Sequence, residues 1–171
     1  MTPARTPSPS PSAPSAGTGH GPGAEGVLAA TQAALAAEHA AAYGYGVIGA
    51  RVAAARGAEA KEAYGRHLAR RDALTRTVRT LGGAPQPAEA AYRLPFAVRT
   101  PADAVRLAAE IEDRVAGAYS DLVRAAQGPL RREAADALTA AAVRAARWRG
   151  GGVAFPGLTE RAGQALPAQH S

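Results

Sequence analysis

The stretch from residue 28 to residue 52 constrains the fold most, because its apolar residues recur with the period of an α-helix. Steps of three and four residues put one stripe of the helix together. This stripe comprises Leu28, Thr31, Leu35, Glu38, Ala42, Tyr45, Gly49 and Val52. Glu38 is its only charged residue. A carboxylate on such a face must be paired, bind a metal ion or remain exposed, so the rest of the fold has to supply its partner.

The composition indicates one all-α domain. The 171 residues are rich in Ala and Arg, with two Phe, one Trp and no Cys, which suits closely packed helices better than sheets. The absence of cysteine excludes disulfides, thiol nucleophiles and Cys-type zinc sites. The net charge is +6, but the arginines are spread over every predicted helix among acidic residues. We therefore expect no nucleic-acid partner, which would favour one dense basic stripe.

The two ends of the chain differ from its centre. Residues 1–24 are rich in Pro, Ser and Gly and bury almost nothing, so we predict a disordered tail. Residues 25–158 form the predicted folded domain, and residues 159–171 a flexible C-terminal tail. Neither a secretory signal nor an apolar run long enough for a membrane span is present. These features predict a cytoplasmic protein without a membrane partner.

Four helices follow from the periodicity. The first is predicted from about Glu25 to Arg56, with Gly57 as its stop, and the second from about residue 58 to residue 81. Residues 82–100 contain three prolines and little helical period, which indicates a crossover along the bundle. Thr100 and Pro101 are a predicted N-cap and first helical position. The third helix runs to about residue 127, and the fourth covers residues 129–149.

Each predicted helix carries an ionisable residue in the middle of its apolar stripe. These residues are Glu38 on the first helix, His67 and Arg71 on the second, Glu112 on the third and Arg144 on the fourth. Short first and third turns with a long second connection predict that the four stripes face one core. The sequence therefore predicts a polar layer across the middle of the bundle.

Several segments together resemble a bacterial ferritin-like family of unknown function. They are A-A-E-H-A-A-A-Y-G-Y-G, H-L-A-R-R-D-A-L, L-P-F-A-V-R-T-P, E-I-E-D-R-V-A-G-A-Y and A-A-V-R-A-A-R-W-R-G. The resemblance covers about residues 25–158. It implies an all-α, ferritin-like four-helix bundle with one long crossover between the second and third helices, and it implies no established reaction.

The wider ferritin-like superfamily uses such a layer to bind two metal ions. Its pattern is a Glu from each of two helices and a Glu-x-x-His from each of the others. Glu38 and Glu112 fit the single carboxylates. The second helix reads Tyr64-x-x-His67, and the fourth reads Arg144 and Arg147 at the two ligand positions. An arginine brings a permanent positive charge where a dication should bind.

Two main interpretations of this layer remain open, beside a partly exposed face or a small anionic ligand held by the arginines. In the first, Glu38 and Glu112 pair with Arg71 and Arg144, His67 hydrogen-bonds to them, and no cofactor is needed. In the second, Glu38, His67 and Glu112 hold iron or manganese. The supporting residues in either case are Tyr45, Tyr64, Tyr119 and Arg147.

The first interpretation favours a non-catalytic structural or binding protein. The second implies a metal-dependent oxidoreductase or another metal-binding protein. Abundant Ala and Gly on the helix faces suggest a homodimer. Val153–Leu158, V-A-F-P-G-L, could fold back onto the bundle or dock onto an unidentified protein partner.

Overall fold

The computed structural model describes residues 22–150, which form an all-α bundle of four long helices without strands in this range. The helices are α1 (Pro22–Gly49), α2 (Gly57–Thr80), α3 (Pro101–Ala125) and α4 (Gly128–Arg149), with a short 3₁₀ helix, η1 (Ala54–Arg56), between α1 and α2. The predicted helical fold class is thus confirmed. Residues 151–158 and the predicted terminal tails up to residue 21 and from residue 159 lie outside the described residues.

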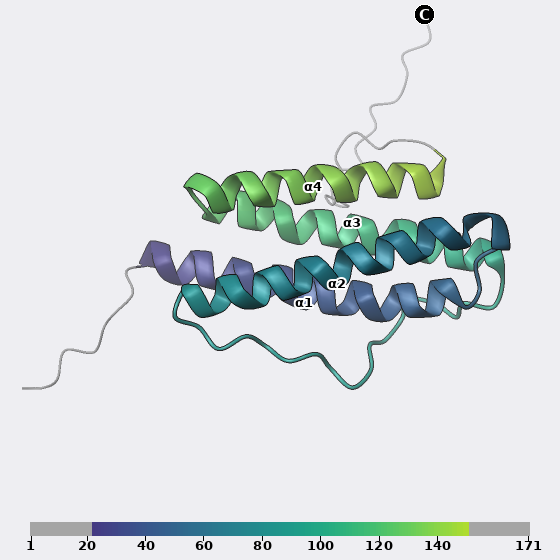
Figure 1. The fold of residues 1–171 in the computed structure, drawn as a ribbon, viewed down its shortest axis with the longest axis horizontal. Coiled ribbons are helices and arrows are strands. Elements are labelled where there is room, and N and C mark those ends of the chain that lie inside the picture. The colour runs from purple at the N-terminus through teal and green to yellow at the C-terminus, as the bar shows by residue number, and fades with distance from the viewer. Residues whose placement is uncertain (1–21, 151–171) are drawn as a thin grey trace, which may run out of the picture.

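The helices pack in a chain of neighbours: α2 on α1, α1 on α3, and α3 on α4. Figure 1 shows residues 81–100 passing from one end of the bundle to the other, so that α2 and α3 run in the same direction. This connection packs Leu94, Phe96 and Val98 against the core. Because these side chains give the segment apolar contacts with the bundle, a connection of this length needs no secondary structure of its own.

The start of α3 follows the predicted capping pattern. The Thr100 hydroxyl accepts a hydrogen bond from the Asp103 backbone N–H, and the Asp103 carboxylate accepts one from the Thr100 N–H. This reciprocal capping box satisfies two backbone donors that a helix start leaves open. Pro101 occupies the first turn, where its missing N–H costs nothing.

The first helical hairpin differs from the prediction. Helix α1 ends at Gly49, seven residues before Arg56, and Gly57 begins α2 in right-handed helical conformation with φ −60°. Glycines 44, 46 and 49 weaken the helix at this end. Gly44 also faces α3, where a Cβ atom would collide with the Ile111 side chain. At the other end, α1 begins at Pro22 and so includes the last residues of the predicted tail.

Two apolar clusters fill the bundle on either side of its middle. One contains Leu35, Leu74, Val78, Val115, Leu122 and Ala141, and the other contains Tyr45, Ile48, Ala63, Leu107, Ala109 and Trp148, among others. On α2, α3 and α4 the positions between these sets are occupied by His67, Glu112 and Arg144. The polar residues therefore lie in a layer between two apolar halves of one core.

None of the helices between residues 22 and 150 combines the length and the apolar character needed to span a membrane.

Candidate functional site

Each helix contributes one ionisable side chain to the layer. Glu38 from α1, His67 from α2 and Glu112 from α3 are completely buried, and the Arg144 side chain from α4 is 13% exposed. Burial of four ionisable groups costs free energy unless each is paired and hydrogen-bonded. Their contacts decide what the layer can do.

His67 links the two carboxylates. Its Nδ1 lies 2.6 Å from Glu38 Oε2, and its Nε2 lies 3.3 Å from Glu112 Oε1. An ionised carboxylate can only accept hydrogen bonds, so both ring nitrogens must donate, and both donate only in the imidazolium form. Burial by itself lowers the pKa of His67, but the hydrogen bonds and charges of Glu112 and Glu38 outweigh it and raise the pKa above its usual value.

Arg144 holds Glu112 with both arms of its guanidinium group. Nε donates to Glu112 Oε1 at 2.7 Å, and the terminal Nη2 donates to Oε2 at 2.9 Å. This two-bonded geometry is the strongest arrangement available to an arginine and a carboxylate. Burial alone would raise the pKa of Glu112, yet the hydrogen bonds from His67 and Arg144 lower it below its usual value. Glu112 therefore stays ionised although it is buried.

Two tyrosines complete the layer. The Tyr119 hydroxyl donates to Glu38 Oε1 at 2.7 Å, and the Tyr45 hydroxyl donates to Glu112 Oε1 at 2.6 Å. Burial, followed by the neighbouring carboxylate charges, raises the pKa of both phenols, so they remain protonated donors.

Trp148 extends the network by one step, since its indole N–H donates to the Tyr45 hydroxyl at 2.9 Å. Trp148 is not among the residues that the sequence predicted for the layer. The available signal was its spacing, because Trp148 lies one helical turn after Arg144.

The layer is electrically balanced and fully hydrogen-bonded. Two carboxylates face one guanidinium and one imidazolium, which makes a formal charge of zero. Among the described residues, no buried side-chain nitrogen or oxygen lacks a hydrogen-bond partner. A network of this kind can stabilise one helix register.

Arg71, Tyr64 and Arg147 lie outside the layer. Arg71 pairs with its chain neighbour Asp72 at 2.8 Å and is about one third exposed. Tyr64 is 39% exposed, and Arg147 is also exposed. The positive charge expected from Arg71 comes instead from protonated His67, and neither the tyrosine nor the second arginine reaches the carboxylates.

The reason lies in the orientation of α2. Its buried residues are Ala60, Ala63, His67, Leu74 and Val78, so the inward direction is centred on His67 itself. Arg71 and Tyr64 both fall toward one edge of that face. On the opposite edge, the guanidinium of Arg70 lies 5.6 Å from the centre of the Tyr119 ring, so Arg70 is the arginine of α2 that approaches the layer.

The arrangement can also be compared with a metal site. In the described part of the chain, no group of three or more His, Asp or Glu side chains is placed to hold a metal ion. His67 uses both ring nitrogens on the two carboxylates, and Arg144 occupies both oxygens of Glu112. The candidate metal ligands therefore contact one another or Arg144, and they do not surround a common point where an ion could bind.

Comparison with known proteins places this chain in a family. Residues 30–160 match the family described as "Domain of unknown function (DUF4439)". The chain belongs to this family. A similar solved structure is the crystal structure of rv2844, a conserved hypothetical protein from Mycobacterium tuberculosis. It shares 36% sequence identity with this DUF4439 protein at a TM-score of 0.72, and the match covers 74% of this chain and 96% of that chain. No curated protein matches.

Proposed function

We propose that this DUF4439 protein is a non-catalytic structural or binding bundle of the ferritin-like class, in which buried ion pairs replace the di-metal site. The observation that carries the proposal is the two-bonded contact of Arg144 with Glu112, at 2.7 and 2.9 Å. The guanidinium occupies both oxygens of Glu112, the carboxylate that a metal-binding bundle would offer to its ions.

The direction of the helices supports the ferritin-like assignment. A long connection between α2 and α3, with short connections elsewhere, is the topology of ferritin-like bundles. In that class a carboxylate from each of two helices and a Glu-x-x-His from each of the other two project into the middle of the core. His67, Glu112 and Arg144 lie between the two apolar clusters along their helices, and Glu38 meets them through His67.

The residues do not fit a di-iron or di-manganese centre. Arg144 and exposed Arg147 stand at the Glu-x-x-His positions of α4, and exposed Tyr64 stands at the Glu position of α2. Because the layer is already neutral, a dication would leave uncompensated positive charge in a buried site unless it displaced the arginine or deprotonated His67. The chain therefore supplies no step of metal chemistry from these positions.

The second candidate is a metal-dependent oxidoreductase or metal-binding protein. The observation in its favour is that Glu38, His67 and Glu112 come together in the core. The two ring nitrogens of His67 lie 2.6 Å from Glu38 Oε2 and 3.3 Å from Glu112 Oε1. For one ion to bind there, His67 would have to lose a proton and at least one carboxylate would have to turn away from its present donor. We expect the free-energy cost of this rearrangement to exceed the free energy gained when one metal ion binds three protein ligands.

Metal analysis of the purified protein distinguishes the two candidates. Protein incubated anaerobically with iron(II), or with manganese(II), is desalted, and bound metal is measured by mass spectrometry together with the thermal midpoint. We expect substoichiometric metal and an unchanged midpoint. Exposed Glu133 provides a matched control as Glu133→Gln. Stoichiometric metal that is lost in Glu38→Gln and kept in Glu133→Gln would overturn the proposal in favour of the metal-binding candidate.

A further inference from the structure

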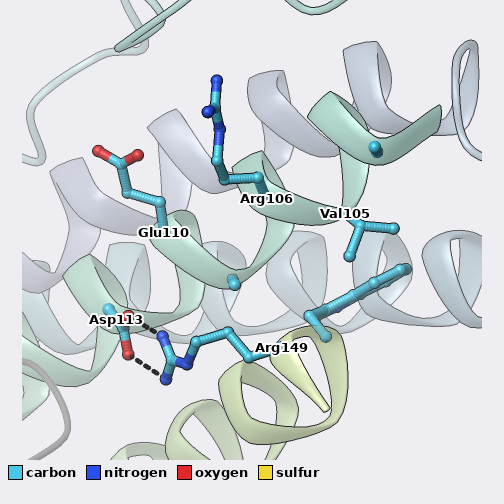
Figure 2. A pocket seen from close by; sticks show the side chains of 8 residues that line it. Val105, Arg106, Glu110, Asp113 and Arg149 are labelled. Atoms are coloured by element: carbon cyan, nitrogen blue, oxygen red, sulfur yellow. Dashed lines mark hydrogen bonds and ion pairs between the residues drawn. The ribbon is translucent and has the colours of Figure 1, made fainter. Parts of the chain in front are cut away.

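A hollow of about 370 Å³ lies on the outer side of the bundle, between the first half of α3 and the end of α4. Val105, Ala109 and Trp148 line its apolar part. Figure 2 shows Val105 on the α3 side and Arg149 reaching across to Asp113 with two contacts. The hollow thus combines an apolar part with four charged lining residues, Arg106, Glu110, Asp113 and Arg149, of which the last two form an ion pair.

We propose that residues 153–158 of the same chain, V-A-F-P-G-L, occupy this hollow, with the Phe155 ring against Val105 and Trp148. The hollow is within the size range of small-molecule pockets, about 300–1,000 Å³, which is enough for an aromatic ring and its neighbours. The segment is uncharged and includes three large apolar residues.

The point where the chain leaves α4 supports this occupant. Two of the residues that line the hollow, Trp148 and Arg149, are also the last two residues of α4. Gly150 caps the helix in left-handed conformation, with φ 78°, which turns the backbone away from the helix axis. Phe155 follows five residues later, and five residues span at most about 17 Å. The chain therefore leaves α4 beside the hollow, and the length of the linker keeps Phe155 within reach of it.

The family match supports the same segment by a separate observation. The DUF4439 match runs from residue 30 to residue 160 and so continues ten residues beyond Gly150. Residues 151–160 thus belong to the family domain, and residues 161–171 fall outside it. Short tethering also favours the chain's own segment over a free partner, because a short linker raises the local concentration to the millimolar range.

Docking here would cover one end of the polar network. Trp148 lines the hollow and donates its indole N–H to Tyr45, which in turn donates to Glu112. Tyr45, Glu112 and Trp148 are already buried, so docking at the hollow would add a contact on Trp148 without changing the access of water to these hydrogen bonds. The inference concerns the surface of the bundle and holds whether or not the layer binds metal.

Disulfide trapping tests the proposal, and the native chain has no cysteine to interfere. The full-length double variant Val105→Cys/Phe155→Cys is oxidised under mild conditions, and the product is followed by non-reducing electrophoresis and mass spectrometry. Two matched controls are Val143→Cys/Phe155→Cys, which uses an exposed valine of α4, and Val105→Cys/Leu166→Cys, which uses a leucine beyond the family match.

We expect an intramolecular disulfide that forms roughly tenfold faster than in either control, because docking raises the effective concentration of the two thiols. Hydrogen exchange of the cysteine-free chain should also show protection of residues 151–160 that is lost in Phe155→Ser. Equal rates in all three double variants would overturn the proposal. A covalent dimer as the main product would overturn it in favour of a second copy as the occupant.

Discussion

Removal of the Arg144 guanidinium tests the energetics of the polar layer. In Arg144→Leu, both oxygens of Glu112 lose their hydrogen bonds from α4, and the formal charge of the layer changes from zero to −1. Glu112 is completely buried and cannot regain water without opening the core. The remaining donors to Glu112 are the Tyr45 hydroxyl at 2.6 Å and His67 Nε2 at 3.3 Å. The His67 ring also donates to Glu38 through Nδ1.

We expect Arg144→Leu to lower the free energy of unfolding by about 3–5 kcal/mol, the usual cost of leaving one partner of a buried pair uncompensated. This is a large fraction of the roughly 5–15 kcal/mol of a typical domain. The matched control is Arg71→Leu, which removes an arginine paired with Asp72 at the surface. We expect the control to change stability by about 0–1 kcal/mol, because solvent screens exposed pairs.

Urea unfolding followed by circular dichroism measures both variants. The double variant Arg144→Leu/Glu112→Gln removes the orphaned charge as well, so it should recover part of the loss and show a coupling of about 0.5–3 kcal/mol between the two sites. If Arg144→Leu and Arg71→Leu cost the same, or if Glu112→Gln recovers nothing, the layer is not held together by this ion pair and our interpretation is refuted.

Three further predictions follow from the same contacts. The pKa of His67 is raised in the folded state, so its contribution to stability is complete below its usual pKa of 6.5 and is lost as the pH rises through the higher folded value. The free energy of unfolding, measured in urea, should therefore fall as the pH rises above 6.5, and this slope should disappear in His67→Gln but persist in His39→Gln. The pKa of Glu112 is lowered, so its contribution is complete above 4.5 and is lost as the pH falls through the lower folded value; acid unfolding should begin at higher pH in Arg144→Leu than in the native chain. Tyr45→Phe and Tyr119→Phe each remove a buried donor from a carboxylate and should cost about 1–3 kcal/mol in thermal or urea unfolding, and a cost near zero in both would contradict the proposed network.

Much of the fold could be predicted because local signals agree with the packing. Thr100 and Pro101 mark the start of α3 through capping chemistry that needs no tertiary contact. The spacing of Glu38 and Glu112 on their stripes also predicts their burial, since the same stripes carry the core residues. The end of α1 could not be predicted with the same certainty, because Gly57 fits a helix stop and a helix start equally well in sequence.

The composition of the layer was predictable only in part. Two consecutive arginines, Arg70 and Arg71, point in directions about 100° apart around α2. They follow His67 by three and four residues, so either one fits a stripe built from such steps. Only the packing of α2 against α1 decides the orientation, and it directs Arg71 to Asp72 and leaves His67 as the central cation. The hydrogen bond from Trp148 to Tyr45 joins residues 103 positions apart, which no local pattern encodes.

The charge state of His67 tests the central claim most directly. Nitrogen-15 NMR of histidine-labelled protein at pH 7 reports the protonation of both ring nitrogens, and His67→Gln assigns the signal. We predict an imidazolium with both nitrogens protonated, which manganese(II) in modest excess broadens no more than it broadens the signal of partly exposed His39. A neutral His67 ring at pH 7, or selective broadening of His67 by manganese, would contradict a bundle held by its own ion pairs, and the selective broadening would identify the layer as a metal-binding site.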